Sequence, residues 1–205
     1  MLLTAQELRM GNSIDETELV IFDTETTGLD VFSGDRVVEI AGIRIKGDKQ
    51  LSIFESLVNP GRNISPGAFK VNGIKQEELN FSPSPRKVFP EFMNFVGQSC
   101  LCSYNAAFDV DFLNNELKLI GSEVISKSSV IDILKISRKI LPGLNKYSLY
   151  SVAQNLKITY PQQHRALADV KMAVDVFLKL KEMAKVSGIK AFGEFLSLFQ
   201  ADSRV

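Results

Sequence analysis

A chain of 205 residues is long enough for one globular domain, and 45% hydrophobic with 23% charged residues is typical of such a domain. The 24 basic and 24 acidic residues balance, which argues against a protein held to duplex DNA by bulk positive charge alone. The start, MLLTAQELRMG, lacks the pattern of a secretory signal, and no segment has the roughly 18 apolar residues of a membrane span. We therefore expect a cytoplasmic protein without membrane contact.

The first half of the chain predicts an antiparallel meander. After a polar lead-in over residues 1–15, the apolar run 17–22 predicts a central strand. Residues 36–46 and 50–58 predict two further strands, joined by a tight turn that contains glycine. In residues 65–80, a proline followed by a glycine limits the chain to short helical pieces.

The second half predicts strands that alternate with helices. Short buried strands are expected at 99–104 and 130–133. One helix is expected to start at the prolines on either side of residue 84 and to continue to residue 96, and another to begin at Asp109. Further helices are expected after residue 133 through 140, over 148–156 and over 166–185. The whole pattern predicts an α/β fold with a mixed sheet flanked by helices. We expect one domain over 16–186 and a tail over 187–205.

The first candidate site lies where the central strand runs into the segment DTETTGL. Asp23 and Glu25 stand two residues apart, so in a strand both carboxylates point to the same face of the sheet. Two such charges repel each other, and a divalent cation removes that cost because Mg²⁺ and Mn²⁺ prefer oxygen ligands. The pair indicates a metal site, although a solvated turn would explain either residue alone.

Two later segments carry further candidates. Asp109 follows the strand over 99–104, at a strand end where such sheets commonly bind ligands, although an acid also suits the first turn of a helix. His164, the only histidine, precedes the last long helix, and Asp169 lies within that helix between apolar neighbours. Burying an unpaired charge there is costly, and a metal ion would supply the missing partner.

In this order, DTETTGL, NAAFD and HRALAD resemble the three motifs of the DEDDh family of 3′→5′ exonucleases. That family includes the epsilon proofreading subunit of bacterial replicative polymerases and several RNA-trimming ribonucleases. The resemblance covers about residues 17–185 and includes LVNPGRNISPGAFKVNGI, which is similar to the family's substrate-side loop. It implies a ribonuclease H-like fold with a five-stranded mixed sheet.

The resemblance also implies two divalent cations, Mg²⁺ or Mn²⁺. By that match Asp23, Glu25 and Asp169 hold one cation, while Asp23 and Asp109 hold the second, the latter through water. His164 would be the general base that takes a proton from the attacking water. Two metals about 4 Å apart stabilise charge on both the attacking and the leaving oxygen, and histidine titrates near neutrality. The expected product is a nucleoside 5′-monophosphate.

In similar enzymes the residues after the acidic pair hold the terminal nucleotide. The corresponding positions, with two further base contacts, are Thr26, Thr27, Gly28, Leu29, Val71 and Phe108. Apolar contacts of this kind accept any base, although ordinary core packing explains the last three residues equally well.

Two positions depart from the proofreading pattern, since Tyr104 and Asn72 stand where such relatives often carry histidine. Substrate preference is therefore not carried over from the resemblance. Phosphate contacts beyond the first nucleotide are expected from Arg165, Lys146 or Lys70.

The tail contains FLSLF at 195–199, which is similar to the short peptide that binds the bacterial sliding clamp, with Phe195 in place of the usual glutamine. The same apolar residues fit one face of a docked terminal helix, which we favour.

The function expected is proofreading or repair by digestion of single-stranded DNA 3′ ends. The alternatives are an RNA 3′-end trimmer and a non-catalytic module bound to a polymerase. A DNA polymerase and the sliding clamp are the candidate protein partners, and the oligomeric state is left open.

Overall fold

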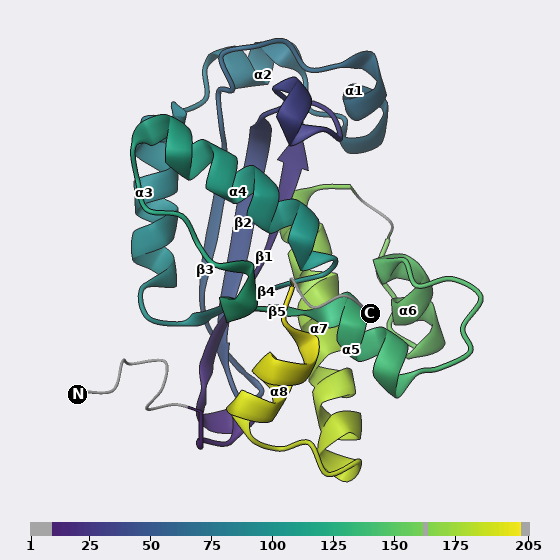
Figure 1. Ribbon diagram of the computed structural model, residues 1–205. Helices are drawn as coiled ribbons and strands as arrows, with labels where there is room; N and C mark the ends of the chain where they lie inside the picture. Colours follow the sequence, from purple (N-terminus) through teal and green to yellow (C-terminus); the bar gives the residue numbers. More distant parts are fainter. Residues whose placement is uncertain (1–9, 162–163, 202–205) are drawn as a thin grey trace, which may run out of the picture.

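The computed structural model describes residues 10–161 and 164–201 of the chain. A five-stranded sheet forms its centre, in the order β3-β2-β1-β4-β5 (Figure 1). The first three strands form the expected antiparallel meander, and the last two are added parallel to β1 on its other side. The strands are β1 (Glu18–Thr26), β2 (Val37–Lys46), β3 (Lys49–Leu57), β4 (Cys100–Ser103) and β5 (Val130–Asp132).

Helices cover both faces of this sheet. They are α1 (Pro66–Asn72), α2 (Gln76–Asn80), α3 (Pro85–Val96), α4 (Ala106–Ile120), α5 (Ile133–Ile140), α6 (Leu149–Asn155), α7 (Ala166–Val186) and α8 (Phe192–Phe199), with short 3-10 turns η2 (Ile14–Glu16), η3 (Val31–Ser33) and η4 (Lys127–Ser129). None of the helices in the described ranges is long and apolar enough to cross a membrane.

Two boundaries expected from the sequence were wrong. Strand β1 continues to Thr26, beyond the expected end at residue 22, and α4 begins earlier than expected. Helix α4 begins at Ala106, three residues before Asp109, after Asn105 takes a left-handed conformation with φ 65°. Asparagine tolerates this conformation better than most residues, and its backbone N–H donates to the Asp132 carboxylate at 3.1 Å. Asp109 therefore points from within the first turn of α4.

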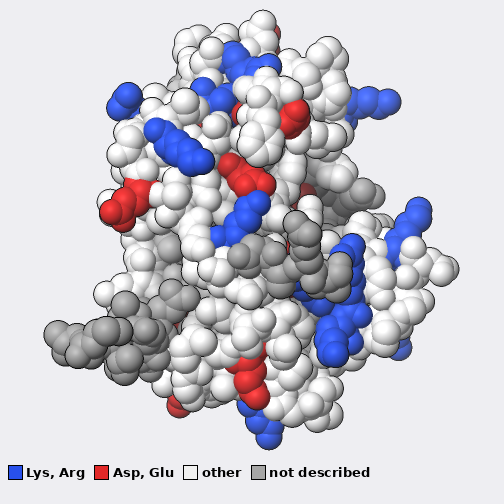
Figure 2. Space-filling model, viewed as in Figure 1, with Lys and Arg blue, Asp and Glu red and all other residues white. Residues whose placement is uncertain are grey.

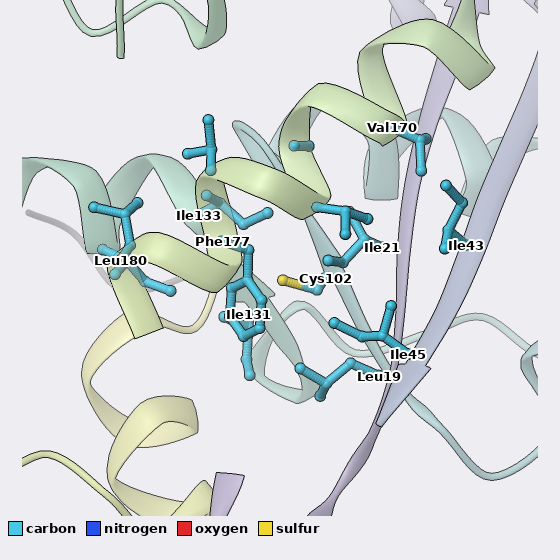
Figure 3. Close-up of a cluster of buried hydrophobic side chains, with 14 of the residues drawn as sticks. Leu19, Ile21, Ile43, Ile45, Cys102, Ile131, Ile133, Val170, Phe177 and Leu180 are labelled. Carbon is cyan, nitrogen blue, oxygen red and sulfur yellow. The ribbon is translucent and has the colours of Figure 1, made fainter. Parts of the chain in front are cut away.

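The alternation of side chains along β1 divides the core into two layers. Leu19 and Ile21 belong to the layer that contains residues of α5, α6, α7 and α8. Figure 3 shows the part of this layer around Cys102 and Phe177. Val20 belongs to the layer on the other face, beneath α3 and α4. Because the period of a strand is two, the same alternation carries Asp23 and Glu25 to the α7 face.

The two ends of the described chain pack together at the opposite end of β1. The backbone N–H of Ile14 donates to Lys190 at 3.0 Å, and that of Phe192 donates to Asn12 at 2.8 Å. Helix α8 buries its apolar face, made of Phe192, Phe195, Leu196 and Phe199, in the α7 layer of the core. Residues 10–14 and α8 are therefore part of the same packed unit as the sheet.

Candidate active site

Three carboxylates from distant parts of the chain converge at the carboxyl end of β1. Asp23 and Glu25 come from β1, and Asp169 comes from the first turn of α7, which packs across this face of the sheet. One oxygen from each lies within 4.8 Å of the others. An all-oxygen set at this spacing suits a hard divalent cation.

The electrostatics of this cluster favour a cation. Burial, followed by the negative charges of Asp109 and Glu25, raises the pKa of Asp23 well above its usual range. Burial and the charge of Asp169 raise the pKa of Glu25 to about 8, and burial with the charge of Glu39 raises that of Asp169 to about 7. A bound cation would reverse these shifts, since it stabilises the ionised form of each acid.

Asp109 lies beside this cluster but is held differently. One oxygen accepts hydrogen bonds from the Thr24 backbone N–H at 3.0 Å and from the Thr24 hydroxyl at 2.7 Å. The other accepts from the Ser103 hydroxyl at 2.6 Å. Burial raises the pKa of Asp109 to about 6, although these hydrogen bonds oppose the increase. Asp109 thus links the ends of β1, β4 and α4.

A buried glutamate, which the sequence analysis missed, fixes the start of α7. Glu39 is paired with Glu25 across the β1–β2 ladder, and its carboxylate accepts from the Arg165 guanidinium at 2.6 Å and from the Ala166 backbone N–H at 2.9 Å. Arg165, expected as a phosphate contact, is therefore ion-paired with Glu39 of the sheet. His164 directly precedes Arg165 and is exposed. Its neighbours 162–163 lie outside the described residues.

A cavity of about 540 Å³ opens beside the carboxylates. It is lined by five of the six residues expected to hold the terminal nucleotide, namely Thr26, Gly28, Leu29, Val71 and Phe108, together with Ser65, Gly67, Ala68 and Asn72. Leu29 is 85% exposed and Val71 55% exposed, so neither is an ordinary core residue. The sixth, Thr27, is fully buried beneath the turn.

The turn after the acidic pair is built around Asp35. The Thr27 hydroxyl donates to this carboxylate at 2.8 Å, and the backbone N–H of Asp30 donates at 3.1 Å. A Cβ added to Gly28 would lie 2.2 Å from an Asp35 oxygen, closer than atoms can approach. The glycine of DTETTGL is therefore required for this packing, which leaves Leu29 at the mouth of the cavity.

The two departures from the proofreading pattern have defined contacts. Asn72, at the end of α1, hydrogen-bonds the Glu25 side chain, which lowers the pKa of that acid against the larger effect of burial. The Tyr104 hydroxyl donates to the Tyr147 carbonyl at 2.7 Å and so ties the loop before α6 to the end of β4.

Carboxylates at the end of a mixed sheet, beside a cavity of ligand size, define a candidate metal-dependent hydrolase. The family model of the RNase_T exonucleases matches residues 20–177. A PolC-type DNA polymerase III from Caldanaerobacter subterraneus subsp. tengcongensis is 34% identical over 183 residues, which cover 89% of this chain and 13% of that polymerase. The DNA polymerase III epsilon subunit of Aquifex aeolicus is 32% identical over 177 residues, covering 86% of this chain and 87% of the subunit.

Exonuclease X, solved in complex with 5′ overhanging duplex DNA, is 27% identical and superposes with a TM-score of 0.67 over 88% of this chain and 98% of that chain. The chain belongs to the RNase_T family of exonucleases. This membership confirms the resemblance and the ribonuclease H-like fold, and divalent metals are typical of the family. The chain spans only 12–13% of the length of the first PolC-type relatives that it matches.

Proposed function

We propose that this protein is a metal-dependent 3′→5′ exonuclease that hydrolyses single-stranded DNA ends to nucleoside 5′-monophosphates. One observation carries the proposal: Asp23, Glu25 and Asp169 converge within 4.8 Å of one another. The cavity beside them is lined by Thr26, Gly28 and Leu29, which follow the acidic pair in the sequence. A cleft that joins metal-binding acids to an apolar wall suits a nucleotide whose phosphate faces the acids.

The acids have separate roles in this proposal. Asp23, Glu25 and Asp169 would hold one divalent cation, and Asp23 with Asp109 would hold a second. Asp109 would act through water, which suits a carboxylate whose two oxygens already accept three hydrogen bonds from Thr24 and Ser103. When bound, Mg²⁺ or Mn²⁺ lowers the pKa of the attacking water and neutralises charge on the leaving oxygen.

His164 takes the proton from the attacking water. It stands directly before Arg165, which Glu39 holds by hydrogen bonds, and an exposed imidazole can exchange the proton with solvent. General bases of this kind contribute roughly 10²–10⁴-fold to the rate.

The apolar wall holds the terminal base without reading it. Leu29 and Val71 stand at the mouth of the cavity, and Phe108 lies in its wall with its ring centroid 4.8 Å from that of Phe112. Apolar contact and stacking accept any base, which suits digestion of any sequence.

DNA is the substrate that the relatives favour, since the Aquifex protein is named as a polymerase subunit and exonuclease X was solved with DNA. A DNA polymerase is the candidate partner for the same reason. Binding of the sliding clamp through residues 195–199 would require α8 to leave the core, because Phe195, Leu196 and Phe199 are buried.

The test is digestion of matched, 5′-labelled DNA and RNA oligonucleotides with Mg²⁺, Mn²⁺ or EDTA. Wild-type protein should produce a descending ladder that is faster on DNA and disappears with EDTA. Asp23→Asn and His164→Ala should remove the ladder. Asp111→Asn is the matched control, since it removes a half-buried acid of α4 that pairs with Lys127.

Three outcomes would contradict the proposal. Faster digestion of RNA would identify a trimming ribonuclease. Intact oligonucleotides in every lane, with tight binding retained, would identify a non-catalytic module. Equal loss in Asp111→Asn would show that general damage, and not the site, explains the variants.

A further inference from the structure

The charges of this balanced chain are unevenly distributed. All 24 Asp and Glu residues lie outside residues 133–168. That segment contains the basic residues Lys135, Arg138, Lys139, Lys146, Lys157 and Arg165. A strongly basic segment in a chain of zero net charge indicates an anionic partner.

This acid-free segment adjoins the candidate active site at both of its ends. It begins after Asp132 at the carboxyl end of β5 and continues through α5 and α6 to the start of α7, where Asp169 lies. In Figure 2, Lys and Arg side chains gather over α5, in the view of Figure 1. Both ends of the segment therefore lie at the edge of the sheet that carries the carboxylates.

Two members of the segment are occupied by contacts within the protein. Lys135 donates to the Gln200 carbonyl at 2.7 Å, and Arg165 is clasped by Glu39 at 2.6 Å. In contrast, the side chains of Arg138, Lys139 and Lys146 are exposed. These three lie on α5 and on the loop that follows it, where an external ligand can reach them, whereas Lys157, also exposed, follows α6.

Tyr104 joins the loop that carries Lys146 to the site. It follows Ser103, whose hydroxyl donates to Asp109, and its own hydroxyl donates to the Tyr147 carbonyl at 2.7 Å. The Tyr147 hydroxyl in turn donates to the Leu141 carbonyl at 2.6 Å, which closes the loop. The backbone of the loop that carries Lys146 is thus tied to the end of β4, next to the contact between Ser103 and Asp109.

Arg138 also lies close to Tyr104. Burial raises the pKa of the Tyr104 hydroxyl, and the positive charge of Arg138 opposes this increase. Tyr104, directly after β4, therefore senses the charge of Arg138 on α5 and holds the backbone of the loop that carries Lys146.

We infer that Arg138, Lys139 and Lys146 form a phosphate-binding surface for the part of a nucleic-acid strand upstream of its 3′ end. The inference rests on the proposed function, because it assumes that the terminal nucleotide occupies the cavity beside the acids. The acidic cluster repels the phosphate backbone. A basic surface next to it offsets this repulsion and guides the strand towards the site. The contacts are to phosphates, so the surface is independent of sequence.

The test is the salt dependence of oligonucleotide binding in EDTA, where hydrolysis is blocked. A variant with Arg138→Gln, Lys139→Gln and Lys146→Gln is compared with a control carrying Arg86→Gln, Lys87→Gln and Lys190→Gln. Both remove one arginine and two lysines, and the control residues are exposed outside the acid-free segment. Circular dichroism and thermal unfolding check that both variants fold.

For a strand of about 15 nucleotides, the surface variant should bind about 10- to 100-fold more weakly at low salt, and the slope of log K against log salt should fall by up to about 2. The gain in affinity from a tetranucleotide to this strand should shrink. The control should match the wild type. Equal slopes in all three proteins would overturn the inference.

Failure of the proposed function is a separate outcome. If wild-type protein with Mg²⁺ leaves the same strand intact, the exonuclease proposal fails. The binding comparison in EDTA still shows whether Arg138, Lys139 and Lys146 bind the strand. If only an acidic peptide distinguishes the variants, and the strand does not, the surface belongs to a protein partner and the inference is wrong.

Discussion

Two clusters of acids lie near opposite ends of helix α7, and they are stabilised in opposite ways. Asp169, in its first turn, joins Asp23 and Glu25 in the site cluster, and Glu182 joins Asp15 and Asp48 in a second cluster of similar spacing. The two sets would look alike to a search for metal-binding acids.

Their protein neighbours differ. In the second cluster the buried Lys181 contacts Asp15 at 2.6 Å and Asp48 at 2.7 Å, and Lys185 contacts Asp15 at 2.5 Å. Burial raises the pKa of Asp15, but the hydrogen bonds from both lysines outweigh this effect and lower it overall. The protein itself therefore supplies two cations to these three acids.

In the site cluster the dominant neighbours are further acids, and the pKa values of Asp23, Glu25 and Asp169 are all raised. The comparison shows that spacing alone does not identify a metal site. The pKa of Asp15, which holds two protein cations, is lowered, whereas the pKa values of the three acids in the site cluster are raised.

The largest expected effect is on the rate of DNA hydrolysis, and it should distinguish the two clusters when one acid of each is replaced. Asp23→Asn should lower the rate of DNA hydrolysis by about 10²–10³-fold, because one group that stabilises the transition state is lost. In EDTA its midpoint of thermal unfolding should equal or exceed that of the wild type, since a buried repulsion is removed.

Asp15→Asn is the matched exchange in the second cluster. It should keep the hydrolysis rate and lower the unfolding midpoint by about 2–4 °C, as for a loss of about 1 kcal/mol. If Asp23→Asn destabilises the metal-free protein more than Asp15→Asn does, the two clusters are not stabilised in opposite ways.

Lys181→Met tests the neutralising cation itself. The buried side chain keeps its volume, but Asp15 loses one of its two lysine partners and Asp48 loses its charged partner. We expect the free energy of unfolding to fall by about 1–3 kcal/mol, measured by urea denaturation. Hydrolysis measured well below the unfolding transition should be unchanged, and Lys179→Met serves as a control on the same helix.

Glu39→Gln tests an acid of a third kind, which lies beside the site cluster but pairs with a cation of the protein, Arg165. The amide keeps the shape and still accepts from Ala166, whereas the charge that holds Arg165 is lost. We expect kcat to fall by about 10-fold or somewhat more, with little change in unfolding midpoint. Glu55→Gln, an exposed glutamate also near Arg165, should retain the wild-type kcat.

The smallest expected effect is a pH dependence of stability. Glu25 and Asp169 have folded-state pKa values of about 8 and about 7, above those of an unfolded chain. The folded state therefore holds protons that the unfolded state has lost, and stability in EDTA should fall as the pH rises from about 5 to about 8.

Mn²⁺ should raise the unfolding midpoint by a few degrees at about pH 8 and by less at about pH 5.5, since protonated acids bind it poorly. In Glu25→Gln the decline with pH should be shallower. A decline that is equally steep in this variant would assign the effect to other groups.

Part of the site could be predicted from residues that are neighbours in the sequence. The alternation of a strand places Asp23 and Glu25 on one face, and the turn signals around DTETTGL locate the end of β1. The start of α4 could not be placed, because the left-handed Asn105 depends on Asp132, a residue 27 positions away.

The sequence by itself determined the strand order along the chain, the paired carboxylates and the three motifs, because strand and helix periods are local properties. Only the tertiary structure decided that Asp169 lies beside Asp23, that Asp109 is held by Thr24 and Ser103, and that Arg165 binds Glu39 rather than solvent. It also decided that Asp15 and Asp48 meet lysines. Each depends on how α7 and α4 pack across the sheet, since long-range packing, and not residue type, fixes which charges become neighbours.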